Sequence, residues 1–178
     1  MFGLLAVADD VSLFFWGKEF VDCGVLIQIL AISLPFTAWS SLLKAQYLLP
    51  LNKEKVFVWS LVAGAVISII LNLILIPLLA SVGAAISTLV AEITVAVYQS
   101  FMIRKEMRFG QYFKDNIIFF VMGAIMFVCV YFVSKIELNL ILKVVVEVLV
   151  GVVVYGIQIL LYMKKNKRIK STLFDKEL

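Results

Sequence analysis

Long runs of apolar residues dominate the chain, and short groups of charged or turn-forming residues separate them. Five of these runs have at least 17 residues, and an α-helix needs about 20 residues to cross the hydrocarbon core of a membrane. Strands of a membrane barrel are about 10 residues long and alternate apolar with polar positions, which these runs do not. The pattern predicts an all-α, polytopic membrane protein with helices at 25–49, 56–80, 84–102, 117–133 and 138–163.

The first 24 residues do not have the pattern of a secretory signal peptide. A signal peptide begins with basic residues and ends at a small-residue cleavage site, whereas this segment is apolar from Met1 and its first charges are Asp9 and Asp10. The aromatic residues at 14–16 suit the outer interface between membrane and water. We expect residues 1–16 to be the end of a helix that begins upstream. A re-entrant or interfacial helix is the alternative, and the two acidic residues fit that alternative better.

Composition supports a membrane environment and excludes several kinds of chemistry. The 178 residues are 63% hydrophobic and 16% charged, with a mean hydropathy of +1.08, whereas soluble domains average about 45–50% apolar and about 25% charged residues. The chain has no histidine, and its two cysteines, Cys23 and Cys129, are far apart in sequence. We therefore predict no metal site, no cofactor and no disulfide framework. A membrane-embedded enzyme normally needs clustered acidic residues or a histidine, so we expect the chain not to be an enzyme.

Basic residues gather on one side of the predicted membrane helices. If the five helices alternate in direction, residues 50–55, 103–116 and the tail after Met163 share a side, and they hold two, four and six lysine or arginine residues. The opposite side holds three. Cytoplasmic loops carry an excess of lysine and arginine. The distribution predicts that the tail, residues 164–178, lies in the cytoplasm.

The basic tail can be explained without a nucleic-acid partner. Residues 164–170 carry five positive charges and follow directly after a predicted membrane helix. A basic residue close to an anionic membrane surface gains about 1 kcal/mol. We therefore predict membrane lipid as a partner and no nucleic acid.

Polar groups inside the apolar runs are candidates for a substrate path, because a lipid-facing helix has little reason to include them. Glu147 lies one turn after Lys143, and a pair at this spacing neutralises itself, so a structural strut is the preferred interpretation. Glu92 has no basic neighbour one turn away, and structural and functional interpretations stay equally open. Lys44 lies near a helix end, where its long side chain can reach the interface. The candidates are Lys44, Gln46, Asn72, Glu92, Gln99 and Glu147, and Gln28 is a further polar residue of this kind.

The segment between the second and third runs has the pattern of a tight helical hairpin. Pro77 removes a backbone donor and bends the chain. Gly83, Ser87 and Ala91 recur at four-residue spacing, and such rows of small residues let helix backbones approach closely. We predict a turn at 81–83 and close helix packing along this row.

Five short motifs follow one another along the chain: Phe15-Trp16-Gly17-Lys18-Glu19-Phe20, Leu48-Leu49-Pro50-Leu51-Asn52-Lys53-Glu54, Asn72 through Pro77, Gly83-Ala84-Ala85, and Ala91-Glu92. In order and spacing they resemble the C-terminal half of bacterial polysaccharide flippases. These are the Wzx-type transporters of O-antigen or capsule repeat units, within the multidrug/oligosaccharidyl-lipid/polysaccharide exporter superfamily. The resemblance covers essentially the whole chain.

The resemblance implies two bundles of six helices around a central cavity in the bacterial cytoplasmic membrane, with this chain as an incomplete second bundle. It implies translocation of undecaprenyl-pyrophosphate-linked oligosaccharide for capsule, O-antigen or exopolysaccharide biosynthesis. The N-terminal bundle would come from the same gene or from a separate chain. Lys44 is the one residue carried over as a contact for the pyrophosphate head group. The alternatives are a multidrug exporter of the same superfamily and a membrane scaffold that does not transport.

Overall fold

The computed structural model describes residues 1–17, 22–104, 109–135 and 139–174, which form helices and short turns and contain no β-strand. Four stretches are long and apolar enough to cross a membrane: Cys23–Leu48, Glu54–Ile103, Ile117–Ser134 and Leu140–Lys164. The prediction of an all-α polytopic membrane protein is confirmed. The elements are α1 (Phe2–Trp16), α2 (Asp22–Leu43), the π-helix η2 (Lys44–Leu48), α3 (Glu54–Ile103), α4 (Phe109–Ser134) and α5 (Leu140–Phe174).

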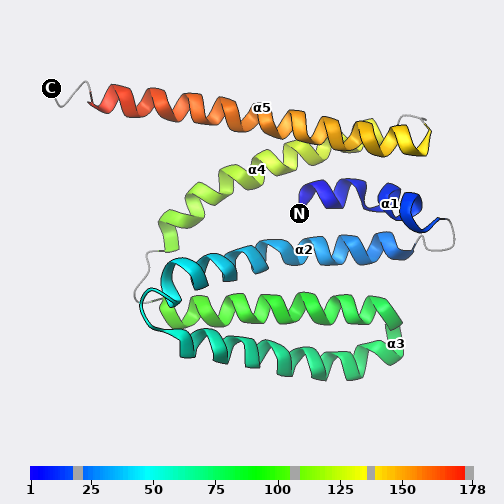
Figure 1. Cartoon of the computed structure of the whole chain (residues 1–178), viewed down its shortest axis with the longest axis vertical. Coiled ribbons are helices and arrows are strands. Elements are labelled where there is room, and N and C mark those ends of the chain that lie inside the picture. Colours follow the sequence, from blue (N-terminus) through cyan, green and yellow to red (C-terminus); the bar gives the residue numbers. More distant parts are fainter. Residues whose placement is uncertain (18–21, 105–108, 136–138, 175–178) are drawn as a thin grey trace.

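The helix α3 is a hairpin of two arms (Figure 1). It has 50 residues, and a straight helix of that length would measure about 75 Å, more than twice the hydrocarbon thickness of about 30 Å. The chain reverses at Ala80, where φ is 47° and ψ is −124°. The arms lie antiparallel, since Gln99 in the second arm donates a hydrogen bond of 2.9 Å to the Ser60 hydroxyl in the first. The reversal precedes residues 81–83, the turn predicted from sequence, and those residues are helical.

Small residues hold the two arms close together. Pro77 lies three residues before the reversal and has no N–H to donate to the preceding turn. Gly83 lies so close to the Leu75 carbonyl oxygen that a Cβ at this position would meet the backbone. Further along, Gly64 faces the Val95 side chain and the carbonyl oxygen of Ala91. Without a hydrophobic driving force between helices in lipid, this close backbone contact is what stabilises the hairpin.

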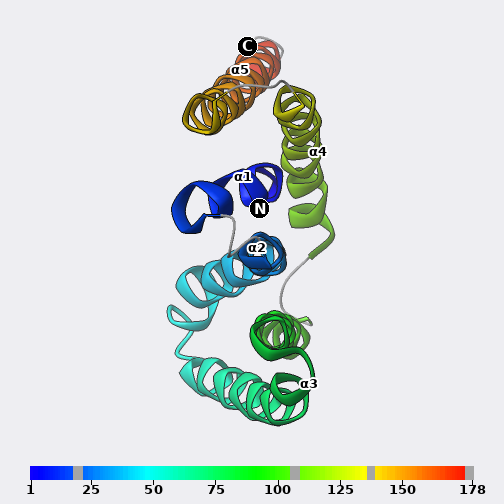
Figure 2. The ribbon, with the colours of Figure 1, turned by 90° about the vertical axis from the view of Figure 1, so that its right-hand side faces the viewer.

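The short helix α1 lies in the middle of the molecule (Figure 2). It packs against α2, α4 and α5, while α2 packs against α3, and α4 against α5. The chain therefore forms two packed groups, α2 with α3 and α4 with α5, and α1 joins them. This arrangement places the first residues of the chain beside its last membrane helix.

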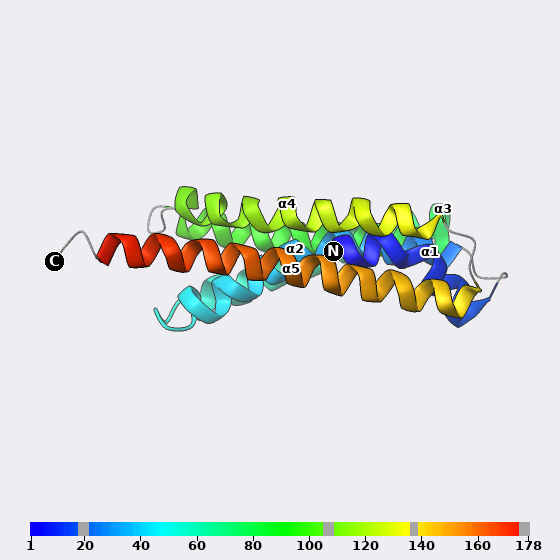
Figure 3. The same ribbon diagram turned by 90° about the horizontal axis from the view of Figure 1, so that it is seen from above.

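The helix axes lie roughly along one common line (Figure 3), and many large apolar side chains are exposed. Leu73 is 74% exposed and Leu78 is 73% exposed. A compact apolar cluster of Leu43, Leu48 and Ile103 is fully buried where η2 meets the end of α3. The wide exposure of large apolar side chains is the pattern expected of a protein whose surrounding solvent is lipid.

A single added methyl group tests the close approach in the hairpin. We expect Gly83→Ala to lower the free energy of unfolding in detergent by about 1–3 kcal/mol, because the new Cβ pushes the arms apart. Gly156→Ala in α5 is the matched control, since no atom lies within 4 Å of the added Cβ. There the free energy of unfolding stays equal or rises by up to about 1 kcal/mol, the gain of replacing glycine inside a helix. Equal effects of the two variants would contradict the packing described here.

Candidate functional site

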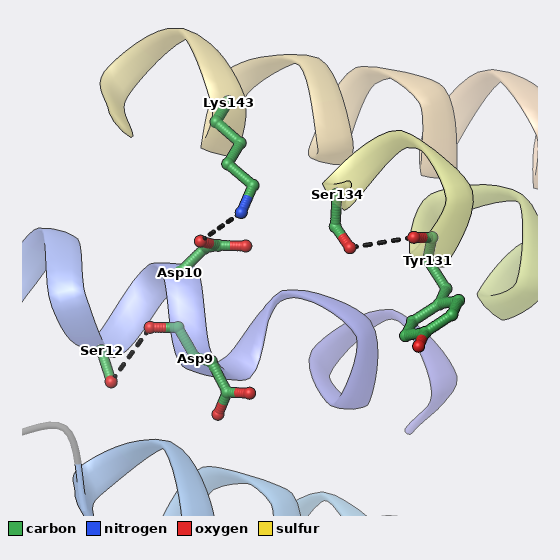
Figure 4. Close-up of polar contacts among 6 residues, drawn as sticks. All are labelled: Asp9, Asp10, Ser12, Tyr131, Ser134 and Lys143. Atoms are coloured by element: carbon green, nitrogen blue, oxygen red, sulfur yellow. Dashed lines mark hydrogen bonds and ion pairs between the residues drawn. The ribbon is translucent and has the colours of Figure 1, made fainter. Parts of the chain in front are cut away.

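Two adjacent acidic residues of α1 reach two different helices. Consecutive residues of an α-helix point about 100° apart, so Asp9 and Asp10 face different neighbours. The Asp9 carboxylate accepts a hydrogen bond of 3.1 Å from Gln28 of α2. The Asp10 carboxylate pairs with the ammonium group of Lys143 of α5 at 2.8 Å (Figure 4). Through this pair of residues α1 makes polar contacts with both helix groups that it joins.

Glu147 completes a charged cluster with Asp10 and Lys143. The sequence suggested a Lys143–Glu147 pair along α5, but the ammonium group of Lys143 instead pairs with Asp10. Glu147 is fully buried, and neither carboxylate oxygen has a hydrogen-bond partner among the described residues. Asp10 and Lys143 both act on it electrostatically. The cluster therefore contains two carboxyl groups and one ammonium group, and two of its members, Lys143 and Glu147, lie in a helix that is long and apolar enough to cross a membrane.

Placing such a cluster among apolar helices costs free energy. A charged group inside a membrane protein costs several kcal/mol unless it is paired or reaches water. Asp10 and Lys143 are paired, and their side chains keep 16% and 22% of their exposure. Glu147 accepts no hydrogen bond from the described residues, and its carboxyl group lies beside that of Asp10. A buried carboxyl group without a partner, next to an ion pair, is the strongest functional signal in the described part of the chain.

Gln99 belongs to a different polar group, between α2 and both arms of α3. Its side-chain oxygen accepts a hydrogen bond of 3.1 Å from Ser40, and its amide nitrogen donates one of 2.9 Å to Ser60. Nearby, the indole nitrogen of Trp39 donates a hydrogen bond of 2.8 Å to Ser100. Gln99 and both serines of the first two bonds are buried, so these bonds join the helices without offering a free polar group to a substrate.

Lys44 and Gln46 lie in η2, at the end of α2. Both are exposed, and the ammonium group of Lys44 lies 4.6 Å from the centre of the Phe57 ring. A π-helix widens one turn and is frequent at functional sites. In η2 the widened turn joins the end of α2 to the first turns of α3 through this cation–π contact.

Asn72 and Glu92 are in α3, away from the charged cluster. The Asn72 amide nitrogen is 3.4 Å from the Ser68 hydroxyl, and its side-chain oxygen is buried without a partner among the described residues. Glu92 is half-buried and forms neither an ion pair nor a hydrogen bond within the part of the chain that the structure describes. The structure thus distributes the candidates predicted from sequence over several places, and only Glu147 lies in the charged cluster.

Four residues of α1 and α5 were not among the predicted site residues: Asp9, Asp10, Lys143 and Gln158. Asp9 and Asp10 were noticed only as the first charges of the chain, because nothing in the sequence shows that α1 contacts α5. Gln158 follows Glu147 by eleven residues, close to three helical turns, so both lie on one face of α5. The side-chain oxygen of Gln158 is also buried without a partner among the described residues. The spacing of Lys143, Glu147 and Gln158 along one helix face was the signal that could have identified it.

A cavity of about 440 Å³ lies where α1, α2, α4 and α5 meet. We call it the central cavity. Phe2 and Gly3 at the start of α1 line it, together with Pro35, Phe120 and Tyr155 from the other three helices. Its lining is mostly apolar, and in the described residues no group of three or more histidine, cysteine, aspartate or glutamate residues is placed to hold a metal ion.

A double-mutant cycle tests the pair between α1 and α5. Asp10→Asn and Lys143→Met should each destabilise the protein in detergent, because each leaves a charge unpaired. The double variant should lose less than the sum of both, with a coupling of about 0.5–3 kcal/mol. Lys135→Met is the control cation, since Lys135 is exposed and its ammonium group lies 5.0 Å from the Tyr131 ring. Its effect should add to that of Asp10→Asn. A coupling of zero for Lys143 would show that the pair does not join the helices.

Comparison with known proteins gives one informative relative. The chain is 28% identical over 138 residues to "Lipid II flippase MurJ" from Bacillus subtilis (strain 168). The alignment covers 74% of this chain and 25% of that protein, so the chain spans about a quarter of the relative's length. No protein-family model matches the chain, and no solved structure matches it. The chain is thus similar to part of a protein that is named as a flippase, and the Wzx-type resemblance stays a prediction.

Proposed function

We propose that the chain is part of a transporter that moves a lipid-linked oligosaccharide across the bacterial cytoplasmic membrane, and that it does not act as an enzyme. The cargo proposed is an undecaprenyl-pyrophosphate-linked repeat unit for capsule, O-antigen or exopolysaccharide biosynthesis. Lipid II, which the relative's name gives as that protein's cargo, is the alternative substrate of the same transport reaction. Because the chain aligns with about a quarter of that relative, we propose that further helices, from the same gene or from a separate chain, complete the transporter.

The observation that carries this proposal is the charged cluster of Asp10, Lys143 and Glu147. Transporters place their ionisable groups inside the membrane, facing the bundle interior, because these groups serve the transport cycle. Alternating access needs two groups of helices that move against each other. In this chain α1 packs against both α2 and the α4–α5 pair, and the ion pair between Asp10 and Lys143 holds α1 against α5.

Glu147, the second carboxyl group beside a single ammonium group, is the proposed site at which proton binding is coupled to transport. With Asp10 paired to Lys143, Glu147 is the group that a coupling proton can neutralise. A proton on Glu147 removes one negative charge beside Asp10, which changes the balance of charges that holds α1 against α5. Binding and release of the proton would then favour different positions of α1, as a ligand must do to drive a conformational change. Lys44, exposed at the end of α2, is the proposed contact for the head group on the side where the cargo is loaded.

A multidrug exporter is the second candidate. The excess of carboxyl groups over ammonium groups in the cluster suits an amphipathic cation as cargo. Purified, complete transporter reconstituted in vesicles separates the two functions. Movement of a fluorescent lipid-linked sugar from one leaflet to the other supports the flippase, whereas export of ethidium without lipid movement supports the exporter.

Replacing Glu147 tests the coupling step. In the complete transporter we expect Glu147→Gln to lower export of repeat units roughly tenfold, within the range of coupling free energies between two sites, while the amount of protein in the membrane stays normal. Glu54→Gln is the matched control, because Glu54 is exposed in the first turn of α3 and should leave export unchanged. Glu92→Gln, which tests the other acidic candidate, should reduce export only if the half-buried Glu92 also lies on the path. Normal export by the Glu147 variant would remove that residue from the mechanism.

Cysteine labelling tests the proposed orientation. In a variant without Cys23 and Cys129, we expect Lys55→Cys to react with a membrane-impermeant maleimide only after the cells are opened. Lys135→Cys at the opposite end should react in intact cells, because the positive-inside rule places the end with more basic residues in the cytoplasm. Both residues are exposed. The reverse labelling pattern would invert the topology.

A further inference from the structure

A second cavity adjoins the central cavity and shares two of its lining residues, Pro35 and Phe120. Its volume is about 340 Å³, and its walls come from α2, the second arm of α3, and α4. We call it the lateral groove. Phe36 and Trp39 of α2 form its floor, Ala96 and Val97 line one wall, and Ile117 and Phe120 line the other. Pro35 and Phe120 line both cavities, so the two adjoin each other.

The groove lies between the described parts of α3 and α4, which do not pack closely against each other. In the described residues α2 packs along α3 and α1 packs along α4, whereas α3 and α4 are not among the closely packed helix pairs. Val97 and Ile117, one on each wall, are both 58% exposed. At this depth of a membrane the surrounding solvent is hydrocarbon, so the groove is open to lipid chains from the side and its apolar walls match them.

A cation lies in line with the groove. Arg104 follows Val97 by seven residues, which is nearly two complete turns, so both lie on one face of the second arm and about 10 Å apart along its axis. The guanidinium group of Arg104 lies 3.9 Å from the centre of the Phe101 ring. Phe101 is one turn after Val97 and is 57% exposed. This contact turns the cation back along the helix, toward the apolar stripe that leads into the groove.

We propose that the lateral groove binds one hydrocarbon chain of an anionic membrane phospholipid whose phosphate group is held by Arg104. The spacing suits such a lipid, because its phosphate lies at the membrane surface and its chains extend from there toward the middle of the bilayer. Guanidinium binds phosphate through two parallel hydrogen bonds, which gives this contact its geometric specificity. The lipid fills a space that the helices leave open and brings a negative charge to the end of the molecule with the basic residues.

The position of the groove favours a resident lipid over transported cargo. Cargo in transit has to pass between the groups of helices, where the central cavity and the charged cluster lie. The groove opens to the surroundings of the described helices, since Val97 and Ile117 on its walls are exposed, and it adjoins the central cavity at Pro35 and Phe120. The occupant is therefore a lipid of the surrounding membrane that stays bound while the transporter works.

Photo-crosslinking tests the proposal. The complete transporter is placed in nanodiscs that contain phosphatidylglycerol with a diazirine at the end of one chain, and cross-linked peptides are identified by mass spectrometry. We expect adducts on residues 35–39, 96–97 and 117–120. Arg104→Gln should lower the yield about fivefold, the effect of one basic contact with an anionic lipid. Val97→Trp should lower it at least as far by filling the groove.

Matched controls separate this site from general lipid contact. Lys55→Gln removes a charge at the same end of the molecule, and Val66→Trp adds the same bulk to a lipid-facing position of the first arm, where Val66 is 50% exposed. Neither should change the yield. Helix content and a single symmetric gel-filtration peak identify the variants that are folded.

Three results would overturn the proposal. One is an equal yield with a phosphatidylcholine probe of the same chain, since that would mean contact without recognition of the anionic head group. Another is displacement of the probe by undecaprenyl phosphate at concentrations at which unlabelled phosphatidylglycerol does not compete, which would assign the groove to cargo. The last is an unchanged yield in folded Arg104→Gln and Val97→Trp. None of these results depends on whether the transporter moves a lipid-linked sugar or a drug.

Discussion

Hydrocarbon offers no hydrogen-bond partner to a peptide group, and this constraint governs the whole structure. Every backbone N–H and C=O group in the membrane interior has to be satisfied within the protein, which a helix does along its own length. The described chain is accordingly built of helices and contains no strand. Side chains are under the same constraint. A buried serine can bond to the backbone of its own helix, as Ser87 does to Gly83. Polar side chains that bond between helices show where helices are joined.

Two groups of polar side chains in the apolar helices have different consequences. Ser40, Ser60 and Gln99 satisfy one another between α2 and α3, and this group stabilises a fixed arrangement of helices. Asp10, Lys143 and Glu147 do not satisfy one another completely, since Glu147 is buried without a hydrogen-bond partner among the described residues. A satisfied network favours one structure, whereas an incompletely satisfied one can respond to a proton or to a moving helix. This difference is why we assign function to the second group.

Sequence reasoning identified the fold class because hydropathy and run length depend on the membrane and not on tertiary contacts. It also identified the region of the hairpin, since Pro77 and the row from Gly83 to Ala91 are local signals. The position of the reversal differed, because Ala80 carries the positive φ although alanine is not a residue that favours it.

The candidate site was harder to predict, because its partners are far apart in sequence. Lys143 and Glu147 have the ideal spacing for a pair along one helix, but the ammonium group pairs with Asp10, 133 residues away. The spacing rule considers residues of one helix only, so it cannot detect that Asp10 on another helix also pairs with Lys143. Gln99 illustrates the same difficulty in the opposite direction, since the sequence shows a polar residue in an apolar run but not the two serines that satisfy it.

The reversal at Ala80 also determines on which face of the membrane the chain ends. The residues from Glu54 to Ile103 form one continuous helical element, and counting it as one crossing instead of two changes the parity of the crossings. Because the two arms are antiparallel, both ends of α3 emerge on the same face, and α4 starts from the face on which α3 began. The backbone conformation at Ala80 thus determines the orientation of α4 and α5 in the bilayer, and with it the side of the membrane on which the basic tail lies.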